Sequence, residues 1–525
     1  MKDAVGLYLR TLRHLRPSQV LYRPVLRASR WCVANGVPTL FGAGSRRRLP
    51  PDPCWPQSFG PIDGAAPPAP APEGNRFLLL GEERDLGSPH EWAQDGASQL
   101  WQFHLHYFEW AWAIEDPDQF ATLWRSWREN QRLGHGDAWS PYVASLRAWT
   151  FCGIHRHLVA GTDIEKPFLD DLAAYTRYLR LLLERDVGGN HLLKNLKALI
   201  GLGVFMQDHR SVRVATRLLQ RQLRVQVLAD GGHYERSPSY HCQVLGDLID
   251  IEALLASAEH PPVEGLTTAI DRMRGWLGAM LHPDGDVPLF NDCVLVGTER
   301  IALLRPHRRP PGRLTVLQPS GYVVIRPDDR IHLVADVGPP CPDDLPAHAH
   351  ADCLSFELSV EHARVIVDTG TSSYAPGPRR QFERSTAAHN TVEIDGVDQT
   401  EVWGTFRAAH RAMPTLESTL EVDDRIEVTA SHDGYERLPG RPRHRRTWRV
   451  SPDRVEIDDE VTGTGRHTVV ARLHAHEGVA VATEPPATET QAVVACDFGR
   501  TAPARVVEST STSQLPLRLT ATITT

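Results

Sequence analysis

The sequence predicts an α+β protein in two large parts, an all-helical half followed by an antiparallel β half. Between about residues 90 and 310, apolar residues recur at helix spacing and are separated by short polar or Gly-rich breaks. From about residue 315, short apolar runs lie between Gly, Pro and Asp turns, without a helical pattern between them. This change of period places the boundary between the halves within residues 305–318.

The composition excludes several classes of protein. The chain has 525 residues, of which 41% are hydrophobic and 23% charged, so it is not a disordered chain. A net charge of −8 argues against a nucleic-acid partner. No apolar run reaches about 18 residues, so no integral membrane segment is expected. The eight cysteines are scattered without a CxxC pair, and we expect them to be reduced.

Residues 1–75 are predicted to form a basic arm followed by a Pro-rich segment. Six arginines interrupt every apolar run of the arm, and no secretory signal is recognisable. The absence of that signal predicts a cytoplasmic protein, with a periplasmic or secreted location as the alternative. We interpret the arm as a solvated helix face; a helical arm on a membrane or an anionic partner is the other interpretation. Residues 50–72 contain nine prolines, which is typical of a linker or an extended wrapping segment.

Residues 76–312 are predicted to form the helical domain. Leucine and isoleucine recur at helix spacing over residues 192–200 and 245–255, and Ser237-Pro238 is a plausible start of the second of these helices. Helices joined by short breaks indicate antiparallel hairpins, hence a bundle or an α/α barrel.

Residues 313–525 are predicted to form an antiparallel β-sandwich. Short strands are expected at 322–325, 331–334, 356–360 and 365–367, and around Val392, Ile426, Trp448, Val455, Val469 and Val493.

Two segments of the helical half carry candidate chemistry. Asn190 and His191 follow a Gly-Gly turn at a predicted helix start, where an anion is favoured, although taken alone the motif is explained more simply by an Asn cap beside a surface His. Within 230–241, Glu235 could be a general acid, Tyr240 an acid or base, and Arg236 a carboxylate ligand. The simpler interpretation is a helix cap with an Arg–Glu ion pair.

A third cluster lies in the β half and suits a metal ion. His348, His350 and Asp352 are followed by Asp368 and His389, and imidazole with carboxylate is a donor set that suits zinc. Unrelated polar loops are the alternative. The second HxH pair, His474 and His476, lacks a third ligand and is interpreted as structural.

Aromatic residues of the helical half are candidate surfaces for stacking on sugars, although most such stripes belong to a core. The candidate substrate-binding residues in these aromatic segments are Trp101, His106, Tyr107, Trp139, Tyr142 and Arg147.

Together these motifs resemble the heparinase II/III-like polysaccharide lyases, which include related alginate lyases. GNHLLKNLKAL, DGGHYERSPSYH, HPDGDVPLFND, HAHADCLSFEL and RRQFERSTAAHNTVEIDGVDQTE occur in the order expected for that family. The resemblance covers about residues 95–410, with a looser fit beyond. It implies an N-terminal incomplete α/α toroid and a C-terminal antiparallel β-sandwich, which agrees with the division read from periodicity.

The resemblance also implies a reaction, β-elimination at a uronic acid of an anionic polysaccharide or oligosaccharide. Asn190 and His191 would neutralise the uronate carboxylate, Tyr240 would be the base, the acid or both, and His348 would be the second catalytic imidazole. Glu235 and Arg236 are expected to contact substrate. His350, Asp368 and His389 match a structural zinc site found in part of the family.

One residue departs from the family pattern, and two other functions stay open. Lys194 stands where relatives commonly carry a carboxylate, which indicates either a more anionic substrate or altered chemistry. A glycoside hydrolase would need two carboxylates, for which Glu235 with Asp230 or Asp292 are the candidates. A non-catalytic glycan-binding or assembly protein is the third possibility, motivated by Lys194. The sequence leaves the oligomeric state open, a dimer included.

Overall fold

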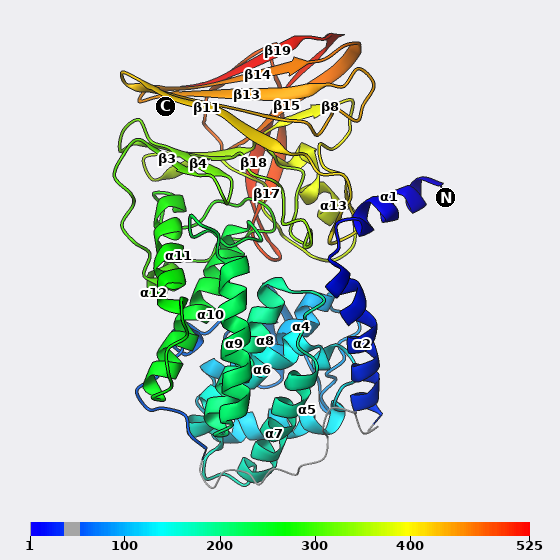
Figure 1. The fold of residues 1–525 in the computed structure, drawn as a ribbon, viewed down its shortest axis with the longest axis vertical. Helices are drawn as coiled ribbons and strands as arrows, with labels where there is room; N and C mark the ends of the chain where they lie inside the picture. Colours follow the sequence, from blue (N-terminus) through cyan, green and yellow to red (C-terminus); the bar gives the residue numbers. More distant parts are fainter. Residues whose placement is uncertain (1, 36–52, 525) are drawn as a thin grey trace. The chain divides into compact units, whose positions relative to one another are not determined.

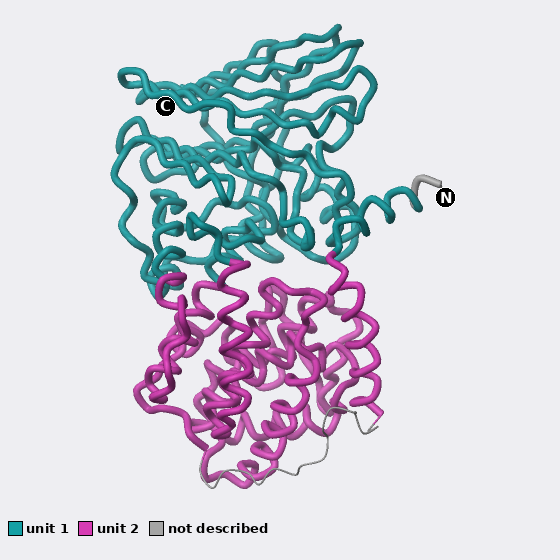
Figure 2. The backbone as a smooth tube through the Cα atoms, in the orientation of Figure 1, with its two compact units in different colours: residues 1–15, 227–243, 271–525 teal, residues 16–226, 244–270 magenta. Residues whose placement is uncertain are grey.

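The computed structural model describes residues 2–35 and 53–524 (Figure 1). The chain divides into two compact units (Figure 2). The helical unit comprises residues 16–226 and 244–270, and the β-rich unit comprises residues 1–15, 227–243 and 271–525. The chain therefore passes between the units several times, whereas the sequence predicted a single boundary near residue 312, because helical periodicity does not reveal which unit a helix packs on.

Most helices contribute to the helical unit. The α-helices are α1 (Lys2–Leu12), α2 (Pro17–Ala34), α3 (Ile62–Ala65), α4 (Gln99–Tyr107), α5 (Pro117–Asn130), α6 (Pro141–Ile154), α7 (Glu165–Leu181), α8 (Gly189–Phe205), α9 (His209–Gln226), α10 (Pro238–Ser257), α11 (Leu266–Met280), α12 (Thr298–Leu304) and α13 (Pro378–Arg384). Short 3-10 or π turns lie at Glu109–Ala113, Asp137–Trp139, His155–Val159 and Thr386–Ala388, and a two-stranded hairpin is formed by β1 (Arg76–Leu79) and β2 (Glu82–Asp85).

The core of the helical unit lies around α6 and α8, which are buried on nearly every face. By contrast, α9 buries one stripe, including Val212, Ala215, Leu219 and Leu223, as expected for an outer helix of a bundle. Of the Pro-rich segment, residues 50–52 lie outside the described residues, and the rest wraps along this unit. The Trp55 ring packs edge-on against Trp149, so this segment belongs to the helical unit.

The β-rich unit contains two large antiparallel sheets (Figure 1). The first follows the order β17-β18-β15-β7-β6-β5-β4-β3, with β8 paired to β15, and the second follows β11-β12-β13-β14-β19-β16. The strands are β3 (Leu314–Leu317), β4 (Tyr322–Ile325), β5 (Ile331–Asp336), β6 (Phe356–Val360), β7 (Ala363–Ile366), β8 (Val392–Ile394), β9 (Val402–Trp403), β10 (Arg407–Ala408), β11 (Pro414–Val422), β12 (Arg425–His432), β13 (Arg443–Ser451), β14 (Arg454–Thr462), β15 (Arg466–Ala475), β16 (Val481–Glu484), β17 (Thr488–Asp497), β18 (Arg500–Gln514) and β19 (Leu517–Thr524).

One apolar core joins the two sheets. It contains Leu333 and Phe356 from the first sheet and Val428, Trp448 and Ile457 from the second, all of them at most 1% exposed. Two sheets that share a core in this way form a β-sandwich. The predicted fold class, a helical toroid followed by an antiparallel β-sandwich, is confirmed, and each predicted strand lies within or overlaps an observed one.

Within the described residues, the helices are either too short or too polar to cross a lipid bilayer.

Candidate functional site

A phenol and an imidazole lie against each other in the β-rich unit. Tyr240 lies in the first turn of α10. As the sequence predicts, this helix begins at Pro238, and the hydroxyl of Ser237 accepts a hydrogen bond from the backbone N–H of Tyr240. Its ring lies 4.0 Å from the ring of His348, centroid to centroid, with 35° between the planes. Tyr240 is half-buried, and its hydroxyl is 3.1 Å from the hydroxyl of Tyr374. The structure therefore brings two of the predicted catalytic residues together.

His348 is held between two carboxylates. Its Nε2 lies 3.2 Å from Oε2 of Glu235, and its Nδ1 lies 3.0 Å from Oδ2 of Asp292. Burial favours the neutral imidazole, but the hydrogen bonds to Asp292 and Glu235 outweigh it and raise the pKa of His348 to about 9. Because both ring nitrogens face carboxylate oxygens, the arrangement favours the doubly protonated, cationic imidazole.

Asp292 is the residue on which this arrangement depends. Its carboxylate accepts hydrogen bonds from both outer nitrogens of Arg380, at 2.8 Å for Nη2, and lies 2.8 Å from Nε2 of His350. The hydroxyl of Thr371 donates at 3.3 Å. Burial would raise the pKa of Asp292, but Arg380 and the imidazoles hold it well below its usual range. Arg380 also lies 4.8 Å from the centre of the Tyr374 ring.

The hydroxyls of Tyr240 and Tyr374 are both neutral at ordinary pH. Burial and the neighbouring hydroxyl raise the pKa of Tyr240 well above its usual value, and burial and Asp292 do the same for Tyr374. Sequence reasoning did not single out Tyr374 and Arg380. Arg380 lies in the RRQFERST segment and could have been found there, whereas Tyr374 lies in an irregular loop between β7 and α13 without any signal of its own.

Glu235 and Arg236 were predicted to contact substrate, and the structure gives both side chains other partners. Glu235 is 1% exposed and faces His348. Arg236 donates to the backbone carbonyls of Pro339 and Pro319, at 2.7 and 3.4 Å. Glu235 therefore supports the imidazole of His348, and Arg236 supports the local backbone. Sequence spacing alone could not distinguish these supporting roles from contact with substrate.

A second cluster in the same unit offers three donor atoms to a cation. His350, Asp352 and His389 are buried, and one ligand atom of each lies within 4.8 Å of the others. Nδ1 of His350, Oδ1 of Asp352 and Nε2 of His389 are buried without a hydrogen-bond partner. Buried polar atoms are rarely left unpaired, so this donor set fits a metal ion.

The carboxylates behind this trio orient its imidazoles. Asp292 lies 2.8 Å from Nε2 of His350, and Asp368 lies 2.8 Å from Nδ1 of His389. A carboxylate on the far nitrogen of a metal-binding histidine is a common arrangement. The prediction named Asp368 as the ligand, whereas the structure places Asp352 in the trio and Asp368 behind His389, because Asp368 already accepts the His389 proton.

The helical unit brings together three of its predicted site residues. The ring of His191 lies 4.3 Å from that of Tyr142, which lies 6.0 Å from that of Tyr107. Nδ1 of His191 is 3.1 Å from Oε1 of Glu184, and the His191 side chain is 38% exposed. Asn190 lies beside it in the first turn of α8 and is 3% exposed. His191 and Tyr142 therefore offer a partly open aromatic surface.

Four other predicted substrate residues belong to the core of this unit. Trp101 and Arg147 have no exposed surface, and Trp139 and His106 are at most 5% exposed. The guanidinium of Arg147 lies 4.3 Å from the Trp127 ring and 5.0 Å from the Trp139 ring, and it donates to the carbonyls of His106 and Ala138. These side chains cannot stack on a sugar, and the arginine satisfies buried carbonyls instead.

Lys194, which departs from the family pattern, is a buried structural residue. Its ammonium lies 2.8 Å from Oδ1 of Asp247, and the ammonium of Lys197 lies 2.9 Å from the same oxygen and 2.7 Å from Asp250. Burial opposes the charge of Lys197, but these aspartates hold its pKa above the ordinary value. The charge of Lys194 is therefore neutralised within the fold.

The carboxylates that a glycoside hydrolase would need are all engaged. Asp230 accepts hydrogen bonds from the backbone and hydroxyl of Ser320, at 2.8 and 2.7 Å. Glu235 and Asp292 lie on opposite nitrogens of His348. A retaining or inverting pair needs carboxylates that face the glycosidic bond, so the geometry argues against this alternative.

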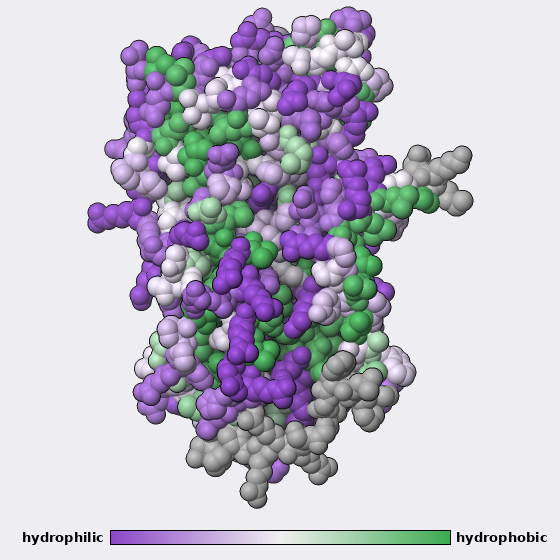
Figure 3. All heavy atoms as spheres, in the orientation of Figure 1, coloured by the Kyte–Doolittle hydropathy of each residue, from purple (hydrophilic) through white to green (hydrophobic). Residues whose placement is uncertain are grey.

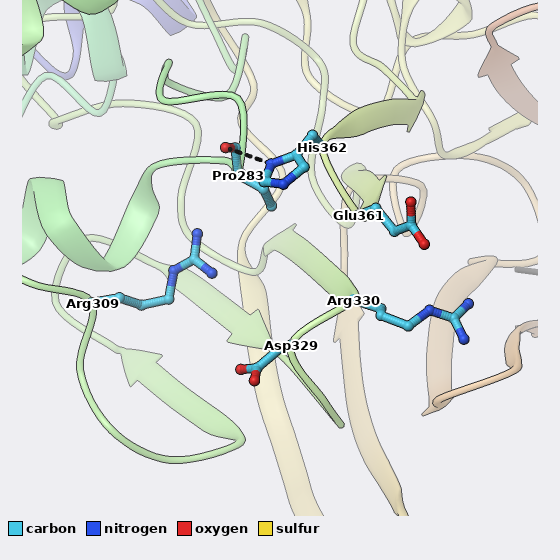
Figure 4. Close-up of a pocket in the computed structure, with 6 residues that line it drawn as sticks. All are labelled: Pro283, Arg309, Asp329, Arg330, Glu361 and His362. Atoms are coloured by element: carbon cyan, nitrogen blue, oxygen red, sulfur yellow. Dashed lines mark hydrogen bonds between the residues drawn. The ribbon is translucent and has the colours of Figure 1, made fainter.

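The β-rich unit also has an open cavity of about 420 Å³ that is distinct from these clusters. Charged side chains line it, and His362 lies 3.3 Å from the carbonyl of Pro283 (Figure 4). None of the site residues named above lines this cavity.

Two family models match most of the chain. Heparinase II/III N-terminus matches residues 91–304, and Heparinase II/III-like, C-terminal matches residues 309–512. A crystal structure of heparinase III superimposes with a TM-score of 0.68 at 14% identity, covering 97% of this chain and 94% of that one. At that identity the likeness shows the fold.

Of two curated relatives, one is named for its localisation in the cell and the other for an enzymatic activity. FtsZ-localized protein C of Caulobacter vibrioides is 30% identical over 386 residues, which cover 69% of this chain and 64% of the relative. A heparin-sulfate lyase of Bacteroides stercoris is 25% identical over 314 residues, which cover 52% of this chain and 46% of the relative. The chain thus spans less than two thirds of the curated relatives it matches.

Proposed function

Because the chain belongs to the heparinase II/III-like family, we propose that it is a polysaccharide lyase that cleaves a uronic-acid-containing glycan by β-elimination. The observation that carries this proposal is the half-buried phenol of Tyr240 lying against the imidazolium of His348. The proposed substrate is an anionic polysaccharide or oligosaccharide. The cation beside the phenol favours negative charge that develops during the reaction.

In the proposed reaction, a base takes the C5 proton, a double bond forms between C4 and C5, and the bond from C4 to the leaving oxygen breaks. An acid returns a proton to that oxygen. Tyr240 is neutral at rest, which suits the donor step. To accept the C5 proton, Tyr240 must first release its own proton to solvent, and the Tyr374 hydroxyl at 3.1 Å offers a hydrogen-bonded path for that proton. The proton taken from C5 is then the one that Tyr240 returns to the leaving oxygen. His348 has both nitrogens engaged, so its role is electrostatic.

Neutralising the uronate carboxylate lowers the cost of removing the neighbouring proton. We propose Asn190 and His191 for this role. The supporting observations are the position of both residues in the first turn of α8 and the partly open aromatic surface of His191 and Tyr142.

Incubation with a panel of uronates, including heparan sulfate, alginate and hyaluronan, tests the proposal. We expect at least one of them to yield the ultraviolet absorbance of an unsaturated uronate. New reducing ends without that absorbance would identify a hydrolase instead. Binding to a glycan of the panel without any turnover would identify a non-catalytic protein. This alternative is retained because one relative is named for its localisation with FtsZ and not for an enzymatic activity.

We also propose that His350, Asp352 and His389 hold a zinc ion that stabilises the loops of the β-rich unit. The three unpaired buried donor atoms and the two carboxylates behind them support this assignment. Bound there, zinc would tie the HAHAD loop to the segment after α13 and take no part in proton transfer.

Removing this metal is expected to lower the midpoint of thermal unfolding by about 5 °C or more, because the ion binds only the folded state. Elemental analysis of the purified protein, and melting curves before and after chelation, measure this. Asp352→Asn is expected to lose the metal, whereas Asp368→Asn should retain it with about 10–100-fold weaker affinity. A metal-free protein whose melting curve is unchanged by added zinc contradicts the assignment.

A further inference from the structure

Helix α2 presents an apolar stripe on its outer face. Val20, Leu21, Val25 and Trp31 are 54%, 70%, 53% and 61% exposed. Pro17, Pro24 and Ala28 are exposed between them, so the stripe recurs every three or four residues along the whole helix. A helix on the surface of a globular protein normally shows its polar side to water.

The inner face of α2 is already occupied. Leu26 and Val33 pack against the core of the helical unit, and the Gln19 side chain donates to the carbonyl of Asp186 at 3.2 Å. The helix is thus held in place by one side while its outer stripe stays uncovered by the described residues. An apolar surface of this length is typical of a site that binds a partner.

Positive charge flanks the stripe. Helix α2 contains Arg23, Arg27 and Arg30 and no acidic residue, and Arg23 and Arg27 are exposed. Residues 2–35 hold seven lysines and arginines against one aspartate, in a chain whose net charge is −8. Arginine can extend its charged end away from an apolar surface while its stem stays on it. The charge therefore favours an anionic partner with an apolar interior.

Helix α1, in the β-rich unit, repeats this pattern independently. Val5, Tyr8, Leu9 and Leu12 are 49–62% exposed and are spaced by three or four residues. The Arg10 guanidinium holds the helix by donating to both carboxylate oxygens of Glu401 at 2.9 and 2.8 Å, and the Tyr8 ring packs edge-on against Trp403 at 4.7 Å between ring centres. Val5, Leu9 and Leu12 are therefore the uncovered part of this stripe. Green, hydrophobic spheres follow each of the two helices in Figure 3.

We propose that α2, and separately α1, bind the surface of an anionic lipid bilayer, with the apolar stripe of each helix in the interface and the exposed arginines of α2 at the lipid phosphates. Amphipathic helices with a basic polar face and an exposed tryptophan bind in this way without spanning the bilayer. A second copy of the chain fits less well, because a symmetric contact would bring the two basic flanks together.

Flotation of the full chain with vesicles tests this inference. We expect the protein to float with vesicles made of equal parts phosphatidylglycerol and phosphatidylethanolamine, and about tenfold less with phosphatidylcholine alone. Leu21→Glu with Trp31→Glu, and separately Arg23→Gln with Arg27→Gln, are expected to reduce the floated fraction about tenfold. Both positions of each pair are exposed, so melting curves should match the unchanged chain.

Val214→Glu with Val225→Glu is the matched control. It adds the same two charges at positions on α9 that are 36% and 40% exposed and lie in the same unit, and it should leave flotation unchanged. Equal flotation with both kinds of vesicle, or flotation that the paired variants do not alter, would overturn the proposal. A concentration-dependent dimer that Leu21→Glu disperses would also overturn it, because the stripe would then be a contact between copies.

Discussion

Replacing Tyr240 with Phe is expected to lower kcat for uronate elimination by about 10²–10⁴-fold, the usual contribution of one positioned acid or base. The change removes one oxygen atom and keeps the ring that lies on His348. KM should change little, because the phenol is proposed to act on the proton and not to hold the glycan. Initial rates of unsaturated product at several substrate concentrations separate the two constants.

Tyr435→Phe is a suitable control for the loss of a tyrosine hydroxyl. The Tyr435 hydroxyl is buried, donates to the carbonyl of Val392 at 2.7 Å, and lies outside the proposed site. Its loss should cost about 1 kcal/mol of stability and leave kcat unchanged. Undiminished turnover in Tyr240→Phe would remove Tyr240 from the mechanism. Tyr374→Phe should fall between the two variants, since it removes only the partner of the Tyr240 hydroxyl.

The second large effect is a loss of stability in mild acid. Burial lowers the pKa of His106 and of His241 to about 3, while an unfolded histidine titrates near about 6.5. Below that pH the unfolded chain binds protons that the folded chain does not, so the free energy of unfolding falls as the pH falls. Each such histidine contributes a slope of about 1.4 kcal/mol per pH unit. Several acting together should destabilise the chain by several kcal/mol near about pH 5.

The hydrogen bonds of these histidines act in the same direction as burial, against protonation. Nδ1 of His106 accepts from the Trp127 indole at 3.2 Å, and Nδ1 of His241 accepts from the backbone N–H of His233 at 3.2 Å. A proton on either nitrogen would replace an acceptor with a second donor. Urea unfolding at several pH values measures the slope. His106→Gln should reduce the slope of the free energy of unfolding against pH by the amount that corresponds to about one proton. His157→Gln, at an exposed histidine, should leave that slope unchanged. A stability that is flat between about pH 7 and 5 would refute this account.

The sequence could predict the fold because both of its periodicities persist over long stretches. Every strand that was predicted was found, but several others were missed. Among these, β11 and β18 have exposed runs of Ser, Thr and Glu with little alternation of apolar residues, whereas β3 and β19 were missed although they carry apolar residues typical of strands. The pairing of Tyr240 with His348 was implied by the family resemblance and not by spacing.

The rest of the site could not be predicted, for physical reasons. A buried aromatic stripe and an exposed one have the same spacing in the sequence. Trp101 and Trp139, which are buried, could therefore not be distinguished from exposed rings that stack on sugars. The structure groups Asp352, and not Asp368, with His350 and His389, and foreseeing this grouping requires knowing which carboxylate already accepts the His389 proton. That is a property of three-dimensional packing, and neither residue's position in the chain reveals it.

Asp292 has a consequence for how this part of the protein can evolve. Its two oxygens serve His348, His350 and Arg380 at once, two of them neighbours in one short loop and the third on α13. The Thr371 hydroxyl is a fourth partner, so no single neighbouring change can replace the carboxylate that these four side chains share. Replacing Asp292 alone would leave its partners without their shared acceptor. A neutral replacement of Asp292 therefore requires simultaneous substitutions in separate segments of the chain.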